Sequence, residues 1–254
     1  MRLHRFFTSE TVGNRNELTI RNAELVSQLR HVFRLKKTDH IVVFDGSGSE
    51  YDCAIADYVG ETALVLDVRA SARCRYMPPR RLYLCAAIVK KDNFETIVEK
   101  ATELGVTDII PVIAERSEKK AVNDSRLKKI AVEASEQSGR GDVPVVHPIM
   151  KLGGLVPLSK HFTFVKRLEE GTSGSPEKVE VESIAFHTEG DTFSRKDLSK
   201  GSPLAIFIGP EGGWSPDEIA MFHKNDVAIR CLGLQVLRAE TAVISALSQV
   251  VFND

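Results

Sequence analysis

The chain has 254 residues, with 34 basic and 35 acidic side chains, a formal net charge of −1, and 43% hydrophobic and 27% charged residues. These proportions are typical of globular proteins and exclude disordered, collagen-like and coiled-coil classes, as well as a strongly basic chromatin-type chain. The longest uninterrupted apolar run, residues 82–89, is much shorter than the about 20 residues of a membrane-spanning helix. The charged start MRLHRFFTSE lacks the apolar centre of a signal peptide, so we expect a cytoplasmic protein.

The four cysteines predict neither disulfides nor a zinc site. They are Cys53, Cys74, Cys85 and Cys231, without a CxxC pair and without a histidine at ligand spacing. We therefore expect free thiols in a reducing compartment and no bound metal.

Residues 1–73 have the pattern of a small β-rich domain. Apolar or alternating segments separated by glycine turns follow one another at 39–45, 51–57 and 62–68. This spacing is typical of consecutive hairpins. Before them, apolar side chains recur at helical spacing over 22–33, so we expect one helix beside the sheet. A small barrel with one helix is the predicted architecture.

A basic segment separates this domain from the rest of the chain. Residues 69–91 contain seven basic side chains and no acidic one, with Pro78 and Pro79 in the middle. Two prolines favour extended backbone, so we predict a linker and a second domain over 74–254. Such charge runs are usually solvated surface, although this one would also suit an RNA phosphate backbone.

From residue 82 onward, apolar strand patterns alternate with amphipathic helix patterns. Strands are predicted at 82–89, 108–113, 143–149, 203–209 and 226–233 and in the apolar stretch around Ala185–His187, and helices at 92–104, 125–138, 215–223 and 239–252. At the start of the first of these helices, Asp92 and Glu95 have the spacing of a capping box. This alternation predicts an α/β domain with a parallel sheet covered by helices on both faces. The polar stretch 168–183 is interpreted as an exposed insertion.

Ligands of open α/β sheets bind at the carboxyl ends of the strands, where two loops of this chain are unusual. The first, Ile208 to Glu218, places several glycines before a helix that begins with Ser215 as cap and Pro216. It is either a tight turn that needs positive φ at Gly212 and Gly213, or a place where backbone approaches a ligand. A phosphate-binding P-loop is disfavoured because no lysine follows the glycines.

The second loop, Leu232 to Ala242, brings Arg238, Glu240 and Thr241 to a helix start. Its structural interpretation is that Glu240 and Thr241 simply favour a helix N-terminus. A third segment, 132–140, contains Glu136 and Arg140 four residues apart, which could be either a helix-stabilising ion pair or part of a site.

Taken together, these segments resemble one family over nearly the whole chain. The agreeing segments are MRLHRFF, HVFRLK with Asp39, FDGSGSEYDCAI, ATELGV with Arg116–Ser117, EASEQSGR with Val143–Pro144, IGPEGGWSPDEI and LGLQVLRAETA. They are similar to the RsmE family of the SPOUT class, methyltransferases that modify N3 of a uridine in small-subunit (16S) ribosomal RNA. Thr38, where the family often has glycine, and the long 168–183 stretch depart from its pattern.

The resemblance implies a PUA-like, RNA-binding β-barrel over 1–73 and a SPOUT domain over 74–254 whose C-terminal part forms a trefoil knot. It also implies a homodimer and S-adenosylmethionine as cofactor. The implied cofactor-binding residues are Thr188, Glu189, Ile208, Gly209, Pro210, Glu211, Gly212, Gly213, Leu232, Gly233, Leu237, Arg238, Thr241 and Ala242.

Within this family reading, the reaction needs a cation near the target base and a proton acceptor, because uracil N3 becomes nucleophilic only when deprotonated. We assign these roles to Arg238 and Glu240, with Glu211 as a second candidate acceptor. The predicted RNA contacts are Arg5, Arg34, Lys36, Arg116, Gln137 and Arg140. The alternatives are a non-catalytic RNA-binding assembly factor on the same fold and, less compatible with the missing lysine, a nucleotide-hydrolysing enzyme.

Overall fold

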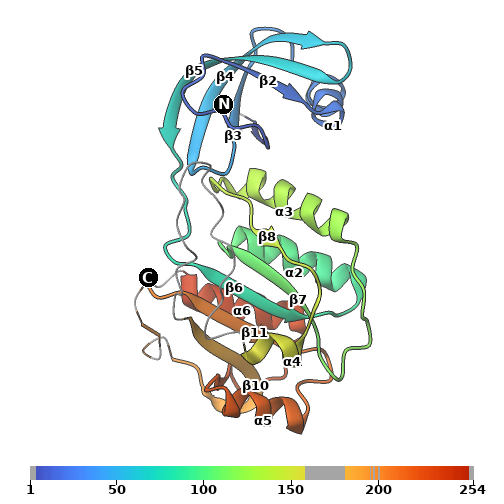
Figure 1. Ribbon diagram of the computed structural model, residues 1–254, viewed down its shortest axis with the longest axis vertical. Coiled ribbons are helices and arrows are strands. Elements are labelled where there is room, and N and C mark those ends of the chain that lie inside the picture. Colours follow the sequence, from blue (N-terminus) through green and yellow to red (C-terminus); the bar gives the residue numbers. More distant parts are fainter. Residues whose placement is uncertain (1–3, 158–180, 195, 197, 200, 252–254) are drawn as a thin grey trace. The chain divides into compact units, whose positions relative to one another are not determined.

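The computed structural model describes residues 4–157, 181–194, 196, 198–199 and 201–251. The chain divides into two compact units (Figure 1). Unit 1 comprises Met1–Met77 and Val132–Val143, and unit 2 comprises Pro78–Ala131 and Pro144–Asp254. The sequence predicts a division at 73/74, and nothing in it indicates that 132–143 joins the N-terminal residues.

Unit 1 is built on a five-stranded sheet in the order β1-β3-β4-β5-β2. Its strands are β1 (Arg5–Phe7), β2 (Glu17–Arg21), β3 (His40–Phe44), β4 (Ser49–Val59) and β5 (Ala63–Arg73). The hairpins β3–β4 and β4–β5 are antiparallel, as the turns predict, while β1 pairs with β3 in parallel. The sequence reading did not include β1 and β2, because three and five residues carry little periodic signal.

The predicted helix over 22–33 exists but changes its winding halfway. It runs as α1 (Ala23–Ser27), capped by the Asn22 side chain, and continues as the π-helical turn η1 (Gln28–Val32). The wider turn is closed by a bond from the Phe33 N–H to the Gln28 carbonyl, five residues back. Because a π turn shifts the apolar register, Val32 is 70% exposed instead of facing the core.

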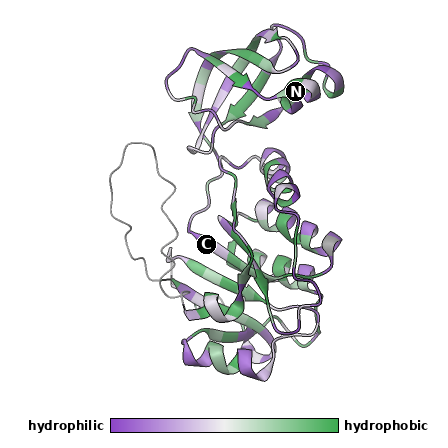
Figure 2. Ribbon diagram, turned by 45° about the vertical axis from the view of Figure 1, so that its right-hand side comes forward, coloured by the Kyte–Doolittle hydropathy of each residue, from purple (hydrophilic) through white to green (hydrophobic). Residues whose placement is uncertain are grey.

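Unit 2 contains the predicted parallel sheet, with seven strands in the order β12-β10-β11-β6-β7-β8 and β9 beside β7. The strands are β6 (Leu82–Ala87), β7 (Asp108–Ile113), β8 (Val145–Val146), β9 (Met150–Lys151), β10 (Glu182–Thr192), β11 (Leu204–Ile208) and β12 (Ala228–Cys231). The helices are α2 (Lys91–Glu103), α3 (Asp124–Ser138), α4 (Leu152–Leu155), α5 (Pro216–Lys224) and α6 (Ala239–Val251). Figure 2 shows the hydrophobic colouring concentrated on the central strands.

Alternating side chains of these strands face opposite helical layers, as expected for a doubly covered sheet. Tyr83 and Cys85 of β6 belong to a core cluster with Leu155 of α4 and Phe222 of α5. Helices α2 and α6 pack against each other, and α6 also contacts β11. All four cysteines are buried free thiols, in agreement with the prediction. No helix in the described part of the chain is long and apolar enough to span a membrane.

Three local predictions need correction. Helix α2 begins at Lys91 with Lys90 as N-cap and no side-chain cap, so the capping box of Asp92 and Glu95 is wrong. The strand predicted over 143–149 is reduced to β8, although the His147 N–H still donates to the Ile109 carbonyl. Of the stretch 168–183, the residues up to 180 lie outside the described part of the chain, and Glu182 already begins β10.

Candidate functional site

The carboxyl ends of β12, β10 and β11 lie side by side, because these strands are parallel neighbours. A cavity of ≈ 340 Å³ lies between the loops that follow β11 and β12 and the middle of β10. It is lined by Arg116, by residues 186–189, by residues 208–214 and by Cys231, Leu232, Gly233, Gln235, Val236, Leu237, Ala239 and Ala242. This is the edge at which open α/β sheets bind ligands.

The cavity includes all the predicted cofactor-binding residues except Arg238 and Thr241. It also includes side chains that sequence reasoning missed, among them Phe186, His187 and Trp214. Phe186 and Trp214 carried no signal beyond apolarity, and a lone histidine is usually an ordinary residue. The structure therefore brings together the two loops selected from the sequence and the strand segment after Phe186. That these residues bind a cofactor stays a prediction at this point.

The glycine-rich loop after β11 is a tight turn held against the sheet. Gly213 has φ of 66° and donates its N–H to the Pro210 carbonyl at 2.8 Å. Positive φ was predicted for Gly212 as well, but of the two only Gly213 adopts it. The indole N–H of buried Trp214 donates to the Phe186 carbonyl at 3.1 Å, which ties this loop to β10. A side chain at Gly209 would bring its Cβ within 3.2 Å of the Trp214 ring.

Glu218 fixes the start of α5 and connects it to a second loop. Ser215 caps α5 as predicted, and its capping box with Glu218 is complete. The two oxygens of the buried Glu218 carboxylate accept from the N–H groups of Ser215 and Glu115, each at 2.8 Å. One carboxylate thus joins the glycine-rich loop to the segment after β7. The S-x-x-E spacing signalled the cap, but the bond to Glu115 had no sequence signal.

Arg116 adds a second connection between the same segments. Its guanidinium donates to the Gly212 carbonyl at 2.8 Å, and its aliphatic stem lies 3.2 Å from where a Cβ of Gly212 would be. The sequence interpretation placed Arg116 among RNA contacts. The structure places it at the rim of the cavity, where it is exposed and also bonded to the loop.

Thr188 and Glu189 lie within β10 rather than after its end. The pairing of β10 with β12 shifts register between Phe186 and Asp191, so these residues occupy a bulge. Gly190 makes the bulge possible, because its missing Cβ would lie 2.6 Å from the Arg230 backbone. The bulge directs residues 187–189 to the cavity instead of continuing the ladder.

The third loop leads into α6 and is the most exposed part of the site. Leu234 and Val236 are 101% and 83% exposed. The Arg238 carbonyl accepts the Ala242 N–H at 2.8 Å, and Glu240 lies in the first turn of α6. The exposed Arg238 and half-buried Glu240 therefore adjoin the cavity through Leu237 and Ala239 without lining it themselves.

The remaining predicted RNA contacts belong to unit 1 and differ in accessibility. Arg34, Lys36 and Gln137 are exposed. Arg5 forms an ion pair with Glu50 and also donates to the Arg140 carbonyl at 3.1 Å. Arg140 is 4% exposed and pairs with Asp142 at 2.9 Å, so we leave it out of the proposed RNA surface.

The basic segment 69–91 is not a solvated linker throughout. Arg69 and Arg73 belong to β5, Arg80 is 7% exposed, and Arg81 pairs with buried Asp108 at 3.4 Å. Arg69, Arg73, Arg75 and Lys90 are nevertheless exposed, so most of the described charge of this segment remains on the surface. No group of three or more metal-ligating side chains occurs among the described residues.

Comparison with known proteins assigns the family. The family model for the RNA methyltransferase domain matches residues 77–251, so the chain belongs to this family. The chain is 31% identical over 236 residues to ribosomal RNA small subunit methyltransferase E of Bacillus subtilis, covering 91% of this chain and 88% of that protein. It is 28% identical over 252 residues to the protein of the same name from Rickettsia conorii, covering 98% and 96%.

A solved structure shares the fold over both units. Ribosomal RNA small subunit methyltransferase E from Neisseria gonorrhoeae, bound to S-adenosyl methionine, aligns with a TM-score of 0.79. The alignment covers 97% of this chain and 96% of that chain at 24% identity. Within the RNA methyltransferase domain family, the predicted resemblance to the RsmE group is therefore confirmed.

Proposed function

We propose that this protein transfers a methyl group from S-adenosylmethionine to N3 of a uridine in 16S ribosomal RNA. The observation that carries the proposal is the cavity at the ends of β10, β11 and β12, which lies within the residues matched by the family model. The curated relatives named as small-subunit ribosomal RNA methyltransferases support the choice of substrate.

The residues around the cavity fit an adenosine-containing methyl donor. Ile208, Leu232 and Leu237 offer apolar surface for a base, while the turn from Gly209 to Gly213 exposes main-chain amides and carbonyls. Such mixed pockets, mostly apolar with a few convergent polar groups, are typical of nucleotide-like ligands. When bound, the donor supplies an electrophilic methyl group on a sulfonium.

The chain's own contribution is positioning and electrostatics, because methyl transfer needs no covalent enzyme intermediate. Deprotonation at N3 spreads negative charge onto O2 and O4 of uracil, and Arg238 is the cation we assign to that charge. Glu240 is the assigned proton acceptor, with Glu211 as the alternative. Arg116 and Glu218 hold the glycine-rich loop in place. The N3 atom lies on the pairing edge, so the target uridine must be unpaired when it reacts.

We further propose the finer features of the family for this chain. They are a PUA-like barrel in unit 1 that binds RNA, a SPOUT-type trefoil knot in unit 2, a homodimer, and action in the cytoplasm. The exposure of Leu234 and Val236 supports the dimer, because isolated soluble chains rarely display adjacent apolar side chains beside a site. Arg34, Lys36, Arg116 and Gln137 are the accessible residues assigned to RNA.

Calorimetric titration of the full chain with S-adenosylmethionine tests the proposal. We expect saturable binding that Ala242→Phe abolishes, because this side chain would fill the cavity from α6. Ala220→Phe, the same exchange at an exposed position of α5, should bind normally. Absence of binding by the unaltered chain would contradict the proposal and favour the non-catalytic RNA-binding factor.

A further inference from the structure

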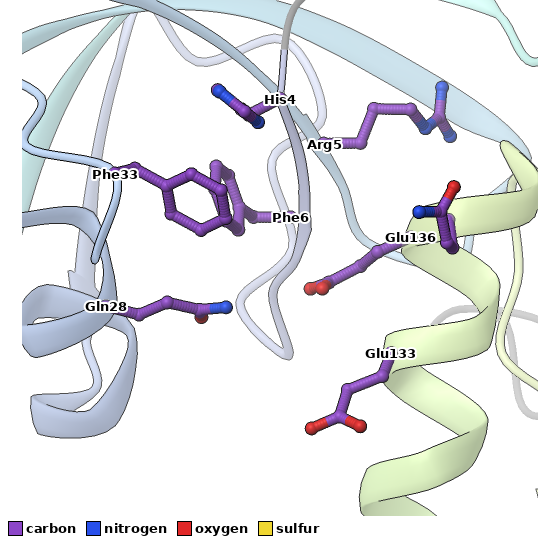
Figure 3. Close-up of a pocket in the computed structure, with 8 residues that line it drawn as sticks. His4, Arg5, Phe6, Gln28, Phe33, Glu133 and Glu136 are labelled. Atoms are coloured by element: carbon purple, nitrogen blue, oxygen red, sulfur yellow. The ribbon is translucent and has the colours of Figure 1, made fainter.

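Unit 1 contains a cavity that the proposed methyl transfer does not use. Its volume is ≈ 510 Å³, and none of its lining residues belongs to the cavity of unit 2 (Figure 3). One side is formed by His4 and Phe6 of the N-terminal segment and by Phe33. The other side is formed by the C-terminal half of α3, with Glu133 and Glu136.

The first side is an aromatic wall. The His4 and Phe33 ring centroids are 4.4 Å apart, and Phe6 packs edge-on to Phe33 with centroids 5.4 Å apart. Phe6 is buried, Phe33 is half-buried and His4 is exposed, so the wall extends from the core to the mouth of the cavity. An exposed aromatic surface of this kind is a platform on which an unpaired nucleobase can stack.

The opposite side presents hydrogen-bond acceptors. Figure 3 shows Glu136 extending from α3 toward Phe6 and Gln28 pointing into the cavity from the other side, while Glu133 lies below Glu136 on the same helix. Glu136 Oε1 accepts the Phe7 N–H at 2.9 Å, which fixes the carboxylate in place. Its Oε2 has no hydrogen-bond partner among the described residues. Burial raises the pKa of Glu136 to about 7, and the neighbouring Glu133 charge adds to this rise.

These groups select against an anion. Glu133, and Glu136 at a pH above its raised pKa, repel a phosphate. Arg5 also lines the cavity and its Nε has no hydrogen-bond partner among the described residues, but its guanidinium is paired with Glu50 and donates to the Arg140 carbonyl. The complementary ligand is flat, uncharged and carries adjacent N–H donors along one edge. Guanine has this pattern, with N1–H beside the exocyclic amine. Uracil instead flanks its single N–H with carbonyl oxygens, which would face the carboxylates.

We propose that this pocket binds one unstacked guanine of the RNA substrate between the aromatic wall of His4 and Phe33 and the carboxylates of Glu136 and Glu133. The inference rests on the proposed function in that RNA is the ligand. The pocket supplies sequence preference at a nucleotide other than the one methylated. It is a recognition site, and Glu136 takes no part in the methyl transfer.

Fluorescence anisotropy with short labelled RNAs tests the pocket directly. The probes are heptauridylates whose central base is guanine, hypoxanthine (which lacks the exocyclic amine) or uracil. We expect the full chain to bind the guanine probe at least fivefold more tightly than the uracil probe, with hypoxanthine between them. Glu136→Gln should remove this preference, because an amide N–H would face the N–H edge of guanine. Glu17→Gln, at an exposed position of β2, should keep it.

A second variant, His4→Ala, tests the aromatic wall. His4→Ala should weaken binding of the guanine probe severalfold without lowering the melting temperature, because His4 is exposed. A guanine preference that is absent in the unaltered chain, or that survives Glu136→Gln, would overturn the proposal. A labelled polyamine that binds the unaltered chain but not Glu136→Gln, with no guanine preference, would overturn it in favour of a cationic ligand.

Methylation of small ribosomal subunits, measured with the same preparations, separates the two proposals. If the protein methylates the subunits but shows no preference for the guanine probe, only the proposal of a guanine pocket is contradicted. A chain that neither binds RNA nor transfers methyl groups contradicts the proposed function as well. For an active enzyme we expect Glu136→Gln to raise the KM for the RNA and to leave kcat unchanged.

Discussion

The Glu218 carboxylate accepts a hydrogen bond from the backbone N–H of Glu115 at 2.8 Å, although the two residues are 103 positions apart in the chain. Because the other oxygen of Glu218 accepts from Ser215, one buried side chain holds two of the segments that surround the proposed methyl-donor site. Glu218 is therefore a positioning residue for the glycine-rich loop as well as a helix cap.

Glu218→Gln should weaken the binding of S-adenosylmethionine about tenfold, or about 1.4 kcal/mol. A glutamine has one acceptor oxygen for two N–H groups, so one of them loses its partner. Ser215→Ala removes the capping hydroxyl at a cost of about 1 kcal/mol but leaves both bonds to the carboxylate. Calorimetry and thermal melting of both variants distinguish capping of α5 from positioning of the glycine-rich loop. If both variants lose the same affinity for S-adenosylmethionine, Glu218 acts only through the cap.

Gly190→Ala should destabilise the protein by about 1–3 kcal/mol, because the new Cβ would lie 2.6 Å from the Arg230 backbone. The bulge that carries Thr188 and Glu189 must then shift, so the affinity for S-adenosylmethionine should fall too. Gly154→Ala, where nothing lies within 4 Å, is the matched control and should melt like the unaltered chain. If Gly190→Ala melts normally and binds S-adenosylmethionine normally, the close contact with the Arg230 backbone does not constrain the bulge.

Glu136 makes stability depend on pH in a defined direction. Its pKa is raised from 4.5 to about 7 in the folded protein by burial, with Glu133 reinforcing and the Phe7 N–H and Arg5 opposing the shift. Between these values the folded state keeps a proton that the unfolded state has lost, so the free energy of unfolding falls as pH rises from about 4.5 to 7.

Chemical denaturation of Glu136→Gln at several pH values measures this contribution. The variant keeps an acceptor for Phe7 and has no charge to bury, so its stability relative to the unaltered chain should rise between pH 5 and 8. Partial exposure reduces the expected gain to about 1–2 kcal/mol. A difference between the two proteins that is constant with pH would contradict the shifted pKa.

Arg238→Ala should retain the fold and lose methylation by roughly 10²–10³-fold, the usual cost of removing one group that stabilises developing charge. The side chain is exposed and the backbone bond to Ala242 survives the exchange, so the melting temperature should not change. Arg238→Lys, which keeps the charge, should recover part of the activity. Full activity of Arg238→Ala would remove this residue from the mechanism.

The sequence predicted those parts of the fold whose signals are local and periodic. The long strands β4 and β5, the parallel core strands and helices α3, α5 and α6 agree with their expected positions. The Ser215 cap was predicted because a serine directly before Pro216 is typical of a helix start. The loops at 208–218 and 232–242 were selected from their residues at strand ends, and the resemblance added Thr188 and Glu189; residues of all three segments line one cavity.

What the sequence did not predict depends on contacts between distant residues. The Glu115–Glu218 bond, the packing of Trp214 under Gly209 and the bulge at Gly190 have no periodic signature. Arg140 was predicted to contact RNA or to pair with Glu136, whereas its buried guanidinium pairs with Asp142. Only the folded arrangement distinguishes a paired charge from an accessible one.

Mass spectrometry of ribosomal RNA nucleosides tests the central claim most directly. Small subunits from cells lacking this protein are incubated with the purified chain and S-adenosylmethionine that carries a deuterated methyl group. The account predicts deuterated 3-methyluridine at a single position of 16S ribosomal RNA, and none with Arg238→Ala. Label in a different nucleoside, or no label in RNA despite tight binding of the donor, would contradict it.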